Sequence, residues 1–201
     1  MKKVLFLHGF FASGSCIPAV ALRNAFGERA EVLTPDLPMH PQDALLFINR
    51  MCIGEHPDVI IGNSNGSFLA QMAVQDTGIP ALLGNPHFEM TTFLEQRTGP
   101  HRYKSPRADG RQDFMIDRKL IGEFASLQAH QFDRCREDMR DKVWGLFGDN
   151  DTLAHYEPVF KEHYTHTFHF PGNHTPTAEE VGKWYVPLAE RLMEKYFNKN
   201  I

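Results

Sequence analysis

The stretch that decides the fold is Gly62-Asn63-Ser64-Asn65-Gly66, which has the pattern G-x-S-x-G. Residues 58–62 form an apolar run typical of a buried strand, and residues 65–76 have the small and apolar side chains typical of a helix. In this motif the serine lies on a tight strand-to-helix turn, and its hydroxyl is exposed above a sheet. We therefore predict that Ser64 is a nucleophile. The alternative is a glycine-rich turn in which Ser64 only caps the helix.

On both sides of this stretch, short apolar runs alternate with longer helical patterns. Strands that alternate with helices are typical of a parallel sheet, because each crossover places a helix against the sheet. We predict an α/β fold with a mostly parallel sheet of about six strands and helices on both faces. The strands are expected at residues 4–7, 30–33, 58–62, 80–83, 142–147 and 166–170, and the helices at residues 15–26, 41–51, 65–76 and from 177 onward.

Three features of the sequence predict where helices begin or bend. Ser15 is a candidate N-cap of the first helix, and Thr177 with Glu180 fits a capping box. Pro187 should kink or split the last helix, because proline lacks the backbone N–H that a helix interior needs.

Residues 88–140 separate two of the expected strands. Helical patterns at 88–95 and 117–130 surround a polar loop at 99–110. An insertion at this point lies beyond the carboxyl edge of the sheet, where open α/β sheets bind ligands. We predict that residues 88–140 form a small helical cap.

A serine hydroxyl needs a general base, and the base needs an acid that orients it. In the chain order typical of this motif, an Asp or Glu and then a His follow the serine on later loops. His174 is the only His in the loop after the last expected strand. Asp151 is favoured as the acid because it lies farther round its turn than Asp149. Asp149, which is typical of a residue that caps the turn, stays the alternative.

Acyl transfer also needs hydrogen-bond donors for the oxyanion of the tetrahedral intermediate. The backbone N–H groups of Asn65 and Phe10 are the candidates, since Phe10 follows the first strand and its sharp turn at Gly9. Phe11, His87 and Phe88 are possible pocket residues. For the aromatic residues at 88–124 a place in the core is favoured over the pocket, whereas for His87 an ordinary loop position fits equally well.

These motifs together resemble the α/β-hydrolase superfamily, and more narrowly the small bacterial YqiA-type esterases. The resemblance implies a cofactor-free carboxylic ester or thioester hydrolase in a single α/β-hydrolase domain, residues 1–201. It implies that Ser64, Asp151 and His174 form the catalytic triad. The matching segments are residues 5–10 with Ser13, residues 35–41 with Asp43, the motif at 62–66, Asn85-Pro86, residues 151–156 and residues 172–174.

The rival interpretation is a catalytically idle member of the same fold that binds a ligand or a partner protein. An idle member has no need of all three residues. The presence of Ser64, Asp151 and His174 in the right order therefore argues against it.

Composition restricts the possible partners and the compartment. The 201 residues carry a formal net charge of −4, which gives no basic footprint for nucleic acid. No apolar run approaches the ~18 residues of a membrane span, and no secretory signal is visible. Three cysteines without a CxxC pattern suit a reducing compartment. We predict a cytoplasmic protein with a small-molecule substrate, no nucleic-acid or membrane partner, and no signal for an oligomeric state.

Two further features of the sequence bear on function. Eleven His residues suggest a metal, but His166 and His169 alternate on an expected strand and would point to opposite faces. No metal site is therefore predicted. The segment 97–111 carries five cations, and it is either a solvated loop or a patch that attracts an anionic substrate such as an acyl-CoA phosphate.

Overall fold

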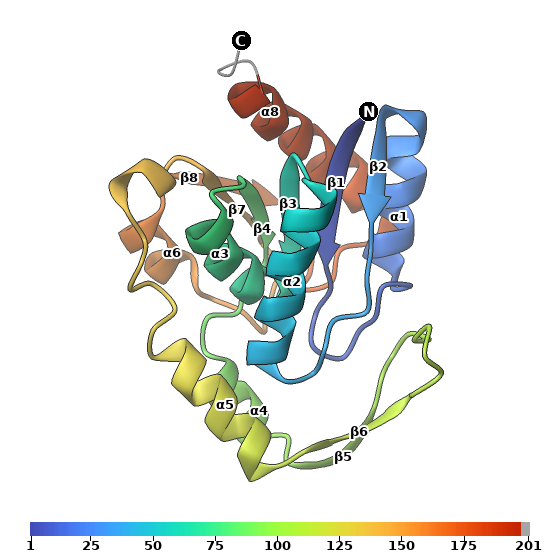
Figure 1. The fold of residues 1–201 in the computed structure, drawn as a ribbon, viewed down its shortest axis with the longest axis vertical. Coiled ribbons are helices and arrows are strands. Elements are labelled where there is room, and N and C mark those ends of the chain that lie inside the picture. The colour runs from blue at the N-terminus through green and yellow to red at the C-terminus, as the bar shows by residue number, and fades with distance from the viewer. Residues whose placement is uncertain (198–201) are drawn as a thin grey trace.

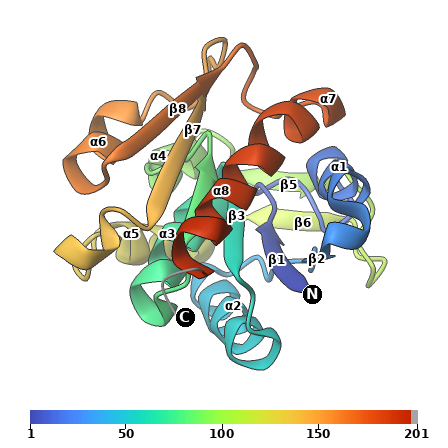
Figure 2. The same cartoon turned by 90° about the horizontal axis from the view of Figure 1, so that it is seen from above.

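A central parallel sheet organises the computed structural model, which describes residues 1–197. Within that range the sheet has six strands in the order β2-β1-β3-β4-β7-β8, and every neighbouring pair is parallel (Figures 1 and 2). The predicted sheet is confirmed, with each strand within two residues of its expected ends. The strands are β1 Lys2–Leu7, β2 Ala30–Leu33, β3 Val59–Asn63, β4 Ala81–Gly84, β7 Val143–Gly148 and β8 His166–Phe170.

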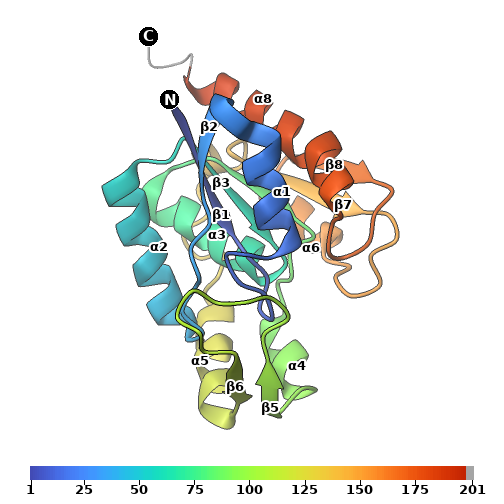
Figure 3. The same ribbon diagram turned by 90° about the vertical axis from the view of Figure 1, so that its right-hand side faces the viewer.

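Helices cover both faces of the sheet, as predicted. One face is covered by α1 Ile17–Phe26 and α8 Val186–Phe197, and the other by α2 Pro41–Glu55 and α3 Asn65–Thr77 (Figure 3). Two short helices, α6 Glu157–His163 and α7 Ala178–Glu180, complete these layers. Within residues 1–197, none of the helices combines the length and the apolarity that a membrane span requires.

Strand side chains alternate between two apolar cores. On β1, Val4 and Phe6 pack under α1 and α8, whereas Leu5 and Leu7 pack under α2 and α3. All four are buried. Successive side chains of a strand point to opposite faces, so a strand covered on both sides reads as a continuous apolar run.

The helix ends differ from the predictions in one case. The capping box of Thr177 and Glu180 is present, and a π-helical segment, Val181–Tyr185, lies directly before α8 and Pro187. A wider turn before the proline fits its missing N–H. Ser15 is not the N-cap of α1. Cys16 holds that position, and the Ser15 hydroxyl bonds the Pro106 carbonyl instead.

Residues 88–128 lie beyond the carboxyl ends of the strands, whereas residues 129–140 run back along the sheet toward the start of β7 (Figure 1). The segment 88–140 contains α4 Met90–Glu95, β5 Gly99–Arg102, β6 Asp113–Ile116 and α5 Arg118–Gln128. The prediction of a polar loop throughout 99–110 was partly wrong, because β5 pairs with β6 in an antiparallel hairpin. Aromatic packing across the hairpin explains the pairing, since His101 stacks on Phe114.

Backbone and side-chain hydrogen bonds hold the hairpin loop against the loops that follow β1 and β2. Lys104 N–H donates to the Phe11 carbonyl at 2.8 Å, and Ser13 Oγ donates to the Pro106 carbonyl at 2.7 Å. Asp36 accepts from the N–H groups of Gly14 and Ala108 at 2.8 and 2.7 Å. The hairpin therefore closes one side of the space above the sheet.

Candidate active site

Ser64 lies on the turn between β3 and α3 with φ 56° and ψ −118°. A positive φ is uncommon for a residue other than glycine and costs backbone strain. The two glycines of the motif are required by close approach. A β-carbon on Gly62 would lie 2.6 Å from the backbone of Gly66, and one on Gly66 would overlap the carbonyl oxygen of Leu7. The turn can form only because both positions lack a side chain.

The structure brings Ser64, His174 and Asp151 together from the loops after β3, β8 and β7. The distances are 2.8 Å from Ser64 Oγ to His174 Nε2 and 2.8 Å from His174 Nδ1 to Asp151 Oδ2. A carboxylate only accepts, so Nδ1 carries the proton and Nε2 is free to accept from the serine hydroxyl. The Asp151 side chain is only 3% exposed.

Asp151, and not Asp149, is the acid that contacts His174. Burial alone would raise the pKa of Asp151, but the bond from His174 and the N–H groups of Leu153 and Ala154 hold that pKa below its usual value. Asp149 instead faces His169, with 3.1 Å between Oδ1 and Nδ1. Asp151 is therefore an anion at neutral pH, and it can only accept the Nδ1–H of His174.

Asn85 fixes the loop that carries His174. Its Nδ2 donates to the carbonyls of Asn173 and His174 at 2.9 and 3.0 Å, and its Oδ1 accepts from Gly148 N–H at 2.7 Å. The residue is 1% exposed and has φ 42°. In the sequence, Asn85-Pro86 stands out only as a pair that matches the family. The signal in the sequence for this position is an Asn that comes directly after an apolar strand.

The two predicted oxyanion donors lie beside Ser64. Asn65 is the first residue of α3, so its N–H has no partner inside the helix. A β-carbon on Gly9 would lie 3.7 Å from Ser64 Cβ, so the loop that leads to Phe10 runs directly against the serine. Asn65 follows Ser64 directly and Phe10 follows Gly9, so both N–H groups belong to loops that border the nucleophile.

His8 holds the loop of Phe10 in place. Its Nε2 accepts from Leu37 N–H at 3.0 Å, so the proton lies on Nδ1, which donates to the Gly9 carbonyl at 2.8 Å. Burial lowers the pKa of His8 to about 4. The neutral imidazole links the loop after β1 to the loop after β2.

A cavity of about 480 Å³ opens at Ser64 and His174. Phe11, predicted as a pocket residue, lines it, together with Phe93, Arg97 and Lys104. A second hollow, of about 580 Å³, lies at the opposite edge of the sheet near Lys142 and does not include Ser64.

The other two residues predicted for the pocket do not line this cavity. Phe88 is 1% exposed and packs on Phe132 in the core. His87 is 3% exposed, and its ring packs 4.9 Å from both Phe93 and Tyr156. Burial, followed by the nearby charge of His174, lowers the pKa of His87 to about 4. Neighbouring aromatic rings therefore cover both side chains and separate them from the cavity at Ser64.

The remaining His residues are dispersed. Within residues 1–197, no three His, Cys, Asp or Glu side chains gather where they could hold a metal ion. His166 contacts Asp141, whereas His169 contacts Asp149 and Glu157.

The five cations of segment 97–111 fall into three groups. Arg102 and Arg111 are exposed and lie near Asp113 and Asp109. Arg107 stacks on Tyr103 and donates to the Leu37 carbonyl. Arg97 and Lys104 line the cavity.

Three solved structures of other proteins show the same fold. A monoacylglycerol lipase from Paleococcus ferrophilus has a TM-score of 0.69 and 14% identity, covering 96% of this chain and 94% of the lipase. The protein Est1E from Butyrivibrio proteoclasticus has a TM-score of 0.65 and 15% identity, covering 98% and 87%. A thioesterase domain from the curacin biosynthetic pathway has a TM-score of 0.63 and 14% identity, covering 96% and 91%. The α/β-hydrolase fold is thereby confirmed.

A family model matches most of the chain. It is described as an uncharacterised protein family, UPF0227, and it matches residues 3–174, a span that includes Ser64, Asp151 and His174. The resemblance to the YqiA-type family is confirmed by this match. The chain therefore belongs to the family UPF0227.

Proposed function

We propose that this protein is a serine hydrolase that cleaves a carboxylic ester or a thioester through an acyl-serine intermediate. The observation that carries the proposal is the pair of 2.8 Å contacts that joins Ser64, His174 and Asp151 at the strained turn above the sheet. A nucleophile, a base and an orienting acid in this order make the arrangement that activates a serine hydroxyl.

In the first half of the reaction, Ser64 Oγ attacks the acyl carbon and His174 Nε2 takes the hydroxyl proton. The oxyanion accepts hydrogen bonds from the N–H groups of Phe10 and Asn65. His174 then gives the proton to the leaving oxygen or sulfur, and the bond from the acyl carbon to that atom breaks.

In the second half, His174 takes a proton from water as the water oxygen attacks the acyl carbon. The bond to Ser64 Oγ breaks, the proton returns to Oγ, and the carboxylic acid leaves. Asp151 holds the imidazole tautomer and stabilises the imidazolium in both halves. This scheme calls for no cofactor.

The comparisons support the class of reaction by analogy. The solved structures with this fold include proteins named as a lipase and a thioesterase, which act on acyl groups. Fold alone does not decide function, so the proposal depends on the geometry of the site.

The proposal also covers the role of residues 88–140 and the compartment in which the protein works. Residues 88–140 serve as a cap on a single hydrolase domain, supported by the hairpin bonds to the loops after β1 and β2. The protein works in the cytoplasm on a small molecule, supported by its three cysteines, which are all free thiols.

A fluorophosphonate probe, which labels activated serines, tests the proposal. We expect the intact protein to be labelled at Ser64, and Ser64→Ala to lose the label. Ser15→Ala is the matched control, because Ser15 lines the same cavity and the variant should keep the label. No labelling of the intact protein would instead favour an idle, ligand-binding member of the fold.

A further inference from the structure

Arg97 and Lys104 are the two cations of segment 97–111 without an acidic partner. Arg102, Arg107 and Arg111 each have an Asp within 4 Å. Within residues 1–197, no carboxylate pairs with Arg97 or Lys104, and no Asp or Glu lines the cavity that both of them reach. The cavity at Ser64 therefore has two positive charges in its wall and no negative charge to balance them.

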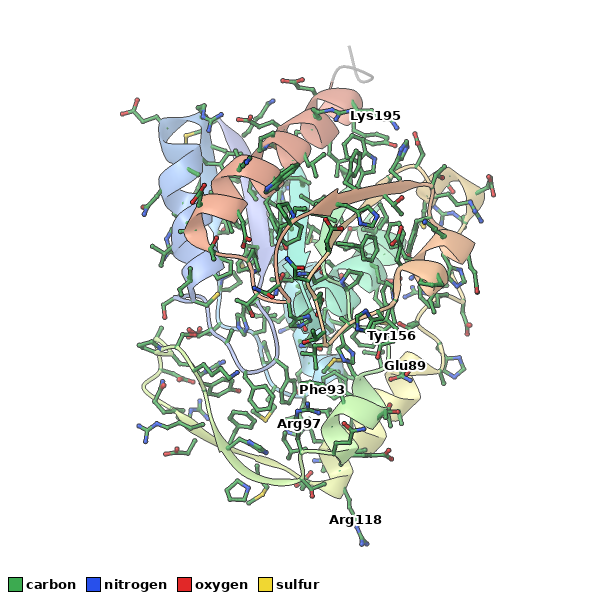
Figure 4. The ribbon with its side chains drawn as sticks, turned by 180° about the vertical axis from the view of Figure 1, so that it is seen from behind. Glu89, Phe93, Arg97, Arg118, Tyr156 and Lys195 are labelled. Atoms are coloured by element: carbon green, nitrogen blue, oxygen red, sulfur yellow. The ribbon has the colours of Figure 1, made fainter. Side chains whose placement is uncertain are left out.

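Arg97 is held in one orientation. Its guanidinium carbon lies 3.9 Å from the centre of the Phe93 ring, and one nitrogen donates to the Phe93 carbonyl at 2.8 Å. Figure 4 shows Arg97 beside Phe93 between the sheet and the hairpin, whereas Arg118 points away from the molecule. A guanidinium has five N–H donors, so the contact with Phe93 leaves a fork free for a ligand.

Lys104 lies across the same aromatic wall. Its ammonium is 5.8 Å from the centre of the Phe11 ring, and its backbone N–H bonds the Phe11 carbonyl. Phe11 and Phe93 meet edge to face at 6.1 Å. The wall thus combines two apolar rings with a cation on each, which suits a ligand that has both an apolar part and an anionic oxygen group.

We propose that Arg97, with Lys104, binds an anionic oxygen group of the substrate, a carboxylate or a phosphate, while the scissile acyl carbon lies at Ser64. The inference rests on the proposed hydrolase function and assigns its substrate class. Arg97 accounts for most of the selectivity because its fork matches two oxygens and is pre-oriented by Phe93.

Matched ester pairs test the proposal and locate the anion. One pair is the p-nitrophenyl monoester of glutaric acid and its methyl ester, which differ in a carboxylate on the acyl side. The other is 4-butyryloxybenzoic acid and its methyl ester, which differ on the leaving-group side. We expect kcat/KM to favour the acid by about tenfold or more in at least one pair.

Variants separate recognition from folding. Arg97→Gln should reduce that preference about tenfold, and Arg97→Lys should restore part of it, because the charge returns without the fork. Arg102→Gln is the matched control: this cation is in the same segment but does not line the cavity, so its variant should keep the preference. Equal losses on acid and methyl ester in Arg97→Gln would overturn the inference.

Binding gives a readout that does not depend on turnover. Ser64→Ala should bind the preferred acid about tenfold more tightly than its methyl ester by calorimetry, and this difference should be lost in Ser64→Ala with Arg97→Gln. A protein that hydrolyses both esters without any preference would refute the anion site and leave the hydrolase proposal intact. A protein that binds the acid selectively but cleaves neither ester would support the anion site and refute the hydrolase proposal.

Discussion

At the scale of single residues, the turn that carries Ser64 depends on glycines, which have no β-carbon. Ser64 keeps a positive φ because β3 and α3 hold both its sides, and Gly66 lets α3 pass against the Leu7 carbonyl. The strain raises the Ser64 hydroxyl above the sheet, at the start of a helix whose dipole favours negative charge.

Adding one methyl group tests this contact. Gly66→Ala should lower the free energy of unfolding by at least about 2 kcal/mol, because its β-carbon has no room beside Leu7. Gly122→Ala, also within a helix but with open space around it, should instead stabilise by up to about 1 kcal/mol. Urea denaturation measures both, and equal effects would show that crowding at Gly66 is unimportant.

The choice between two neighbouring acids is also a residue-scale question. Asp151→Asn should lower kcat for a neutral ester by about 10³- to 10⁴-fold, because the amide no longer holds the reactive tautomer of His174. Asp149→Asn, whose partner is His169, should change kcat less than about twofold. A larger loss in Asp149→Asn than in Asp151→Asn would reverse the assignment.

At the scale of elements, the ends of three strands are joined through one amide. Asn85 at the end of β4 bonds Gly148 at the end of β7 and the two carbonyls of the loop after β8. The position of His174 is therefore set by strand ends that are far apart in sequence.

Removing this amide should disturb stability and chemistry together. Asn85→Ala removes the side-chain partner of the Gly148 N–H and of the Asn173 carbonyl, and it leaves the His174 carbonyl with only the 3.5 Å contact from Asn63 Nδ2. We therefore expect a loss of about 2 kcal/mol in unfolding free energy. Fluorophosphonate labelling of the folded fraction should also slow at least tenfold. Asn49→Ala, which removes a single bond to Asp76, should leave labelling unchanged. Unchanged labelling in Asn85→Ala would mean that the loop holds its own shape.

The elements also show what the sequence could predict. The six strands were placed within two residues because strands covered on both faces are continuous apolar runs. The β5–β6 hairpin was missed because, apart from the buried Ile116, its residues alternate between partly and fully exposed positions. Its pairing also depends on a partner more than ten residues away.

The same limit applies to the site. The G-x-S-x-G spacing and the loops after the expected strands were sufficient to predict that Ser64, Asp151 and His174 lie at one edge of the sheet. The direction in which the rings of His87 and Phe88 face depends on packing with Phe93, Tyr156 and Phe132, which residue spacing does not contain. Likewise, composition could not separate Arg97 and Lys104 from the paired cations beside them.

At the scale of the whole molecule, two buried imidazoles make folding depend on pH. Burial lowers the pKa of His8 and of His87 to about 4, below the ordinary value of 6.5. Between these values the unfolded chain binds protons that the folded chain does not. Stability is therefore complete above about pH 6.5 and falls as the pH decreases toward about 4.

The expected loss from His8 alone is about 3 kcal/mol across that range. Urea unfolding at a series of pH values should show this slope in the intact protein. His8→Asn, which removes the titrating group, should show a shallower slope even where it is less stable overall. A free energy of unfolding that stays flat from pH 7 to pH 4 would mean that these imidazoles are not held neutral.

The acyl-serine intermediate is the most direct test of the central claim. The protein is mixed with p-nitrophenyl butyrate, quenched in acid within the first turnovers, digested and measured by mass spectrometry. We predict one added butyryl group on the peptide that contains Ser64, formed with a burst of p-nitrophenol and absent in Ser64→Ala. Ester cleavage without any acyl group on Ser64, or with the group on another residue, would contradict the account.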